Sequence, residues 1–153
     1  MTVDDRFTIG LVAGSIAGVV QLLWSLMSRF VFHWTNKSLA GFGALISFNK
    51  PPESLFEHFW GSLVALGTAA GLGIVFAYLL FYIRRENLYL KAVVFSMAAW
   101  YLLNDAIIPR ISDTTEGPFS LGTVSSGAIG SILFGVVLAF IFKYFMERAH
   151  VER

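Results

Sequence analysis

Residues 7–34 read FTIGLVAGSIAGVVQLLWSLMSRFVFHW and form the first of several long apolar runs in the chain. Small residues come first, polar residues next and charge only near the end; the positions at helical spacing are Gly10, Gly14, Gly18, Gln21, Ser25, Arg29 and His33. Small side chains four residues apart let two helices approach closely in a membrane, and polar ones hydrogen-bond across such a contact. The run therefore predicts the packing seam of a transmembrane helix bundle.

The composition indicates a membrane protein. Of the 153 residues, 56% are hydrophobic and only 14% are charged, and the apolar residues lie in long runs. The net charge is only +1, which is too small for the basic surface that nucleic-acid binding requires, so we expect no nucleic-acid partner. The chain has no cysteine, which excludes disulfides, thiolate metal sites and cysteine nucleophiles.

Four runs are long enough to cross a bilayer, for which a helix needs roughly 20 apolar residues. We predict transmembrane helices over residues 7–34, 55–83, 88–108 and 119–142, packed as one bundle in a single domain, 1–153. The link at residues 84–87 is so short that the second and third helices must form an antiparallel hairpin. The predicted fold class is an all-α, polytopic membrane protein with four transmembrane helices.

The connection over residues 35–54 is longer and contains a separate apolar run, residues 39–48. Ten residues are too few to span the membrane, so we expect this run to lie on the outer surface or to dip into the bundle as a re-entrant segment. Ser54 and Glu57 have the spacing of a capping box at the start of the second long helix.

The distribution of basic residues predicts the orientation. Four crossings place on one side seven Lys and Arg residues, namely Arg6, Arg84, Arg85, Lys91, Lys143, Arg148 and Arg153. The other side then carries the remaining four, which are Arg29, Lys37, Lys50 and Arg110. Because loops rich in Lys and Arg stay in the cytoplasm, we expect a multi-pass plasma-membrane protein with both termini inside.

Rows of small residues recur in two other predicted helices. They comprise Gly67 with Gly71, and Gly127, Ser131 and Gly135. In a chain with four helices we favour contacts inside the monomer, because each helix already has neighbours. The alternative is a face that binds a second copy of the chain or another membrane protein.

Ionisable residues gather toward the outer side, and charge in membrane segments is costly enough to make each a candidate site residue. The candidate is a shallow outer polar pocket of Arg29, His33, His58 and Asp105. Two histidines and a carboxylate can bind a divalent metal, and an arginine can hold an anionic lipid headgroup. The histidines lack a diagnostic metal-site spacing, so we expect no metal. A simpler interpretation is that Arg29 pairs with Asp105 and ties the first helix to the third.

The middle of the predicted membrane contains no ionisable group. The deepest polar residues are Gln21, Thr68, Ser96 and Ser131. Ion-coupled carriers need an ionisable or ion-binding group at this depth, and the sequence contains no catalytic motif either. We therefore expect no enzymatic activity and no cofactor.

The layout resembles small four-helix bacterial inner-membrane proteins of the YagU and YqhR kind. The resemblance lies in the glycine-rich first helix from Gly10 to Gly18, the long outer loop, His58 early in the second helix, and Lys91 with Trp100 in the third. It implies a four-helix membrane fold and brings no activity with it. We expect an accessory, assembly or structural partner of lipids or other membrane components. The alternative is a small oligomeric transporter or channel with an outer-facing polar vestibule.

Overall fold

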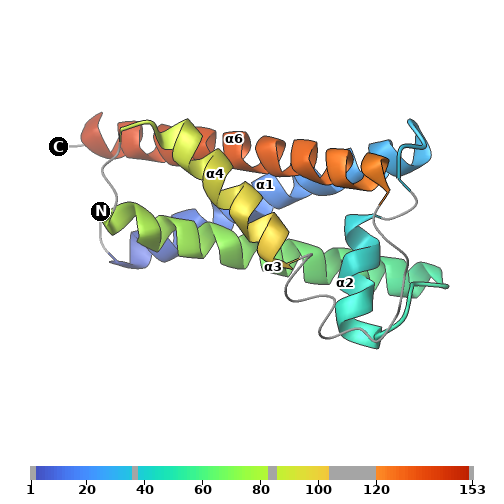
Figure 1. Ribbon diagram of the computed structural model, residues 1–153. Helices are drawn as coiled ribbons and strands as arrows, with labels where there is room; N and C mark the ends of the chain where they lie inside the picture. The colour runs from blue at the N-terminus through green and yellow to red at the C-terminus, as the bar shows by residue number, and fades with distance from the viewer. Residues whose placement is uncertain (1–2, 36–37, 83–85, 104–119, 152–153) are drawn as a thin grey trace.

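The computed structural model describes residues 3–35, 38–82, 86–103 and 120–151 as an all-α protein. Its helices are α1 (Val3–Phe30), α2 (Leu39–Phe48), α3 (Leu55–Tyr82), α4 (Leu88–Tyr101) and α6 (Leu121–Val151) (Figure 1). The described residues contain no strand, which confirms the predicted all-α class.

Three of these helices, α1, α3 and α6, are long and apolar enough to cross a membrane. Four spanning helices are not confirmed, because α4 has only 14 residues and residues 104–119 lie outside the described part of the chain. The predicted helix at 88–108 therefore corresponds to α4 only as far as Tyr101. Asp105 lies in the same undescribed segment.

The ends of the long helices differ from the predicted ones where local chemistry overrides the apolar pattern. The helix predicted at 7–34 begins earlier, at Val3, and ends at Phe30. There the chain turns: His33 takes a left-handed backbone conformation (φ 52°), and the Trp34 N–H donates to the Ser28 carbonyl at 3.0 Å. The helix predicted at 119–142 continues to Val151, past the end of its apolar run.

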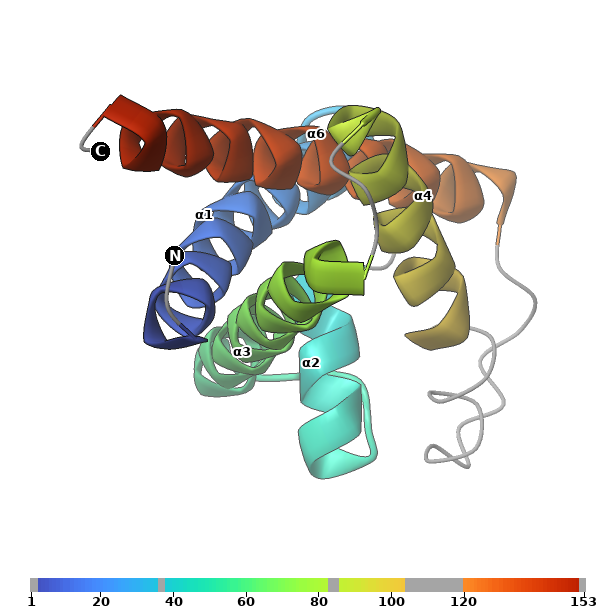
Figure 2. The ribbon, with the colours of Figure 1, turned by 90° about the vertical axis from the view of Figure 1, so that its left-hand side faces the viewer.

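The helices form two packed sets that share α1. This helix packs against both α3 and α6, while α4 lies on α6 and α2 lies on α3 (Figures 1 and 2). The consecutive helices α3 and α4 make only marginal contact with each other. They meet at Phe76 and Phe95, whose ring centroids are 5.2 Å apart, and diverge toward α2.

The glycines of α1 lie directly against α3, as a packing seam requires. A Cβ on Gly10 would lie 2.8 Å from the Ile74 Cα, and one on Gly14 would lie 2.9 Å from the Gly73 Cα. At Gly18 it would lie 2.5 Å from the Cβ of Ala69. These contacts are inside the monomer and depend on the absence of side chains at the three positions.

Of the small residues in the other helices, those of α6 face a neighbouring helix and the predicted pair in α3 does not. A Cβ on Gly67 or Gly71 would meet nothing within 4 Å, and the α3 glycine that contacts α1 is Gly73. On α6, Gly127 lies against the Trp100 ring and Gly135 against the backbone of α4. Ser131 accepts a hydrogen bond from the Ser96 hydroxyl through its carbonyl at 2.6 Å. The row on α6 therefore packs on α4, whereas a side chain at Gly67 or Gly71 would point into open space.

The apolar run at 39–48 is a helix that crosses α3 at a steep angle near the start of that helix (Figure 1). Ser38 caps its first turn, because the Ser38 hydroxyl oxygen accepts from the Gly41 N–H at 3.1 Å. Asn49 ends it in a left-handed conformation (φ 52°), with its N–H bonded to the Leu45 carbonyl. The face of α2 toward α3 is buried and consists mainly of Ala and Gly.

Candidate functional site

A cavity of about 70 Å³ lies between α3 and α4, in the wedge where these helices diverge. It also reaches α1, α2 and α6, and most of its wall is apolar, including Leu39, Phe42, Ile46, Val64, Leu72 and Phe134. Four polar side chains contribute to the wall: Gln21, Thr68, Ser96 and Ser131. These are the four that the sequence places deepest in the membrane, so the structure brings them to one place.

A second, smaller cavity of about 30 Å³ adjoins the first on the side of α1 and α6. The two share Gln21, Leu39, Phe42 and Trp100 in their walls. The wall of the second is more polar, because it includes Ser25, Thr35, Ser38, Thr123 and Ser126. We call the two hollows the central cavity and the polar cavity.

Hydrogen bonds join the helices around the polar cavity. The Ser25 hydroxyl accepts from the Leu39 N–H at 2.7 Å and so ties the start of α2 to α1. The hydroxyls of Thr35 and Thr123 lie 2.8 Å apart, and the Trp24 Nε1–H donates to the Ser126 carbonyl at 3.0 Å. Polar atoms there are thus used mainly to join α1, α2 and α6.

Arg29 and His33 both line a shallow depression on the surface. This depression adjoins the polar cavity, because Thr35 lines both. The Arg29 Nη1 donates to the Ser38 hydroxyl at 3.3 Å, and its guanidinium lies 5.4 Å from the centroid of the Phe30 ring. No carboxylate in the described part of the chain pairs with Arg29. The predicted Arg29–Asp105 pair falls outside the described residues.

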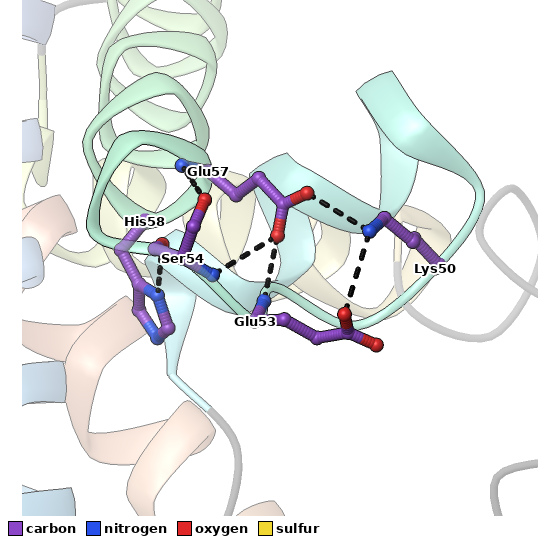
Figure 3. A network of polar contacts seen from close by, with 5 residues as sticks. All are labelled: Lys50, Glu53, Ser54, Glu57 and His58. Carbon is purple, nitrogen blue, oxygen red and sulfur yellow. Dashed lines mark hydrogen bonds and ion pairs between the residues drawn. The ribbon is translucent and has the colours of Figure 1, made fainter.

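His58 does not line the depression and belongs to a different network, at the start of α3 (Figure 3). Its Nδ1 lies 3.0 Å from the Ser54 carbonyl oxygen. The candidate pocket thus divides into Arg29 with His33, and His58 apart from them. Among the described residues, no three His, Cys, Asp or Glu side chains lie close enough to hold a metal ion.

The network around His58 contains the predicted capping box. The Ser54 hydroxyl accepts from the Glu57 N–H at 3.2 Å, and the Glu57 Oε2 accepts from the Ser54 N–H at 3.2 Å (Figure 3). Glu57 also accepts from the Glu53 N–H at 2.6 Å and pairs with the Lys50 ammonium at 2.9 Å. The hydrogen bond from Lys50 to Glu57, together with the negative charges of Glu53 and Glu57, raises the pKa of Lys50 above its usual value. The arrangement stabilises the turn from α2 to α3.

The site that the described residues do assemble is therefore the central cavity, with the polar cavity beside it. Its four polar residues are those that the sequence predicts to lie deepest in the membrane, but its existence depends on the divergence of α3 and α4. Ser38 and Thr35 are site residues that the sequence pattern does not identify, although a serine directly before an apolar run is a helix-start signal. Comparison with protein-family models, with curated proteins and with solved structures finds no match to this chain.

Proposed function

We propose that this chain is a non-enzymatic, multi-pass protein of the plasma membrane that acts as an accessory partner of membrane lipids by holding a lipid chain between α3 and α4. The observation that carries the proposal is the central cavity, whose wall is mainly apolar. Ligand sites are usually concave and apolar with a few polar groups that fix orientation.

The packing beyond the cavity favours binding over conduction. Phe76, Phe134 and Leu138 are almost fully buried in the half of the bundle away from α2. The Phe76 ring lies 5.2 Å from Phe95 and 5.6 Å from Phe142, so aromatic side chains fill the narrow end of the wedge. A chain held in the cavity would end against this layer.

The orientation of the chain in the membrane is part of the proposal. The start of α1 and the end of α6 lie at the same end of the molecule, opposite to α2 (Figure 1). Together with the seven basic residues counted on that side, this supports cytoplasmic termini. A reporter fused after Arg153 should then behave as cytoplasmic, and a periplasmic signal would contradict the topology.

A small oligomeric transporter is the second candidate, because three hollows follow one another from the surface inward. The depression at Arg29 shares Thr35 with the polar cavity, which in turn shares Gln21 and Trp100 with the central cavity. Such a series is what an entry path for a ligand requires. Uptake into proteoliposomes would favour transport, and lipid retention without uptake would favour the accessory role.

Lipid retention by the purified protein tests the proposal. Thr68 lines the cavity, whereas Leu63 on the same helix is exposed on the bundle surface. We expect native mass spectrometry to detect bound lipid on the wild type and on Leu63→Phe, and to find it lost from Thr68→Phe, whose ring would fill the cavity. Equal retention by both variants would overturn the proposal.

A further inference from the structure

Gln21 differs from the other polar residues of the central cavity. Gln21 lines both the central and the polar cavity, and its amide makes no hydrogen bond to another described residue. Its side chain passes α6 at Gly130, where a Cβ would lie 3.8 Å from the Gln21 Nε2. A neutral amide offers two N–H donors and one acceptor oxygen, and no other described residue uses those of Gln21.

The three hydroxyls of the central cavity, those of Thr68, Ser96 and Ser131, each donate a hydrogen bond to a carbonyl oxygen. Thr68 donates to Val64 at 2.9 Å, Ser96 to Ser131 at 2.6 Å, and Ser131 to Gly127 at 2.9 Å. A hydroxyl has one hydrogen and two lone pairs, so these three can still accept but not donate. Among the amide and hydroxyl groups of this wall, the donors that the described residues leave unused are therefore those of Gln21.

The depth of Gln21 makes this unused capacity significant. The end of α1 at Phe30 lies nine positions further along, which is about 14 Å along a helix. That is roughly half of the approximately 30 Å hydrocarbon core. Polar groups there have no bulk water to bind and are costly unless something satisfies them.

We propose that the lipid held in the cavity is a neutral lipid with a free hydroxyl, such as a diacylglycerol, and that Gln21 recognises this hydroxyl. A hydroxyl both accepts from the Gln21 N–H and donates to an acceptor oxygen, and it matches what the wall leaves unused. None of the residues lining the central cavity is ionisable, so a charged headgroup would be buried without a counter-charge. The inference rests on the proposed function, because it names the lipid class held by the same cavity.

Two photoreactive lipids test this in the wild-type protein. One is a diacylglycerol with a diazirine in an acyl chain, and the other is the same lipid with its hydroxyl methylated. In nanodiscs we expect the hydroxyl lipid to label cavity residues about threefold to tenfold more than the ether, the range for one hydrogen bond. Gln21→Leu should reduce this ratio to about one, while Leu23→Ala, at an exposed position of α1, should keep it.

The outcomes separate the two claims. If both lipids label cavity residues equally in the wild type, the hydroxyl inference is overturned and the proposed lipid site stands. If neither lipid labels these residues, the inference fails, and lipid retention by Thr68→Phe and Leu63→Phe decides the proposed lipid site separately. Because the ratio is measured first in the wild type, the test decides even if Gln21→Leu does not fold.

Discussion

Gly43 of α2 and Gly61 of α3 pack backbone against backbone, and a methyl group on either would overlap the main chain of the other helix. Ala40 and Ala44 lie at the same contact, so three small residues of α2 surround Gly61. Close approach of this kind maximises dispersion contacts between helices in a membrane. The crossing positions α2 beside the cavity, whose wall includes Gly43 and Phe42.

Gly61→Ala should therefore weaken the attachment of α2. Its methyl group would meet backbone that cannot move aside cheaply, and overpacking typically costs about 1–3 kcal/mol. A decrease in the free energy of unfolding, measured in detergent, checks this expectation. Gly67→Ala is the matched control on the same helix, since its methyl group would meet nothing within 4 Å. An equal effect of the two substitutions would contradict the contact.

Gly73 and Gly71 provide a second matched pair, at the seam between α1 and α3. A Cβ on Gly73 would lie 2.5 Å from the Gly14 Cα, whereas one on Gly71 would meet no atom within 4 Å. We expect Gly73→Ala to lower the unfolding free energy by about 1–3 kcal/mol. Gly71→Ala should be neutral or stabilising by up to about 1 kcal/mol, because alanine is the better helix former. Stability lost in Gly71→Ala alone would show that Gly71 forms the seam.

These pairs also show what the sequence can predict. Spacing identifies Gly10, Gly14 and Gly18 as a seam, and in the structure all three lie against α3. The same spacing in Gly67 and Gly71 gives no information on which way α3 is rotated. The partner is Gly73, which lies two residues beyond the predicted row.

The sequence predicts some helix ends and not others. The start of α3 follows from the Ser54 and Glu57 capping box, which the sequence contains in full. The end of α6 does not follow from the sequence, because the length of an apolar run indicates how much of a helix lies in the hydrocarbon core and not where the helix ends. Beyond Phe142 the helix continues through polar residues, where Lys143 and Glu147 form an i,i+4 ion pair at 3.8 Å.

The sequence identifies the four polar residues of the central cavity, but it predicts the site elsewhere, at Arg29, His33, His58 and Asp105. Residues at similar depth on separate helices were expected to be the deepest polar groups, and they line the central cavity. Whether they enclose a hollow depends on α3 and α4 diverging from Phe76, and no local pattern encodes that angle. The separation of His58 from His33 likewise depends on helix packing, whereas His58 contacts the Ser54 carbonyl of its own first turn locally.

Ser54→Ala tests the capping box at the turn between α2 and α3. The substitution leaves the Glu57 N–H without the hydroxyl that accepts from it at 3.2 Å. Loss of such a cap costs about 1 kcal/mol, which should appear in the unfolding free energy. Ser47→Ala is the control, because that hydroxyl bonds to the Gly43 carbonyl of its own helix and alanine suits a helix at least as well. No difference between the two would mean that the cap does not stabilise α3.

Phe134 and Phe140 on α6 test whether the inner end of the cavity is a packed wall. Phe134 is 2% exposed and lines the cavity, whereas Phe140 is 61% exposed on the bundle surface. Phe134→Ala removes a ring that the neighbouring helices cannot replace, so we expect the unfolding free energy to fall by about 3 kcal/mol. Phe140→Ala should cost much less, because lipid chains replace the contacts of an outward-facing ring.

Solute flux through liposomes that contain the wild-type protein separates the two candidate functions. If the wall only bounds a binding site, the wild type should be impermeable to small solutes. Solute flux through the wild type, or equal stability of the two variants, would show that this end of the bundle is not closed.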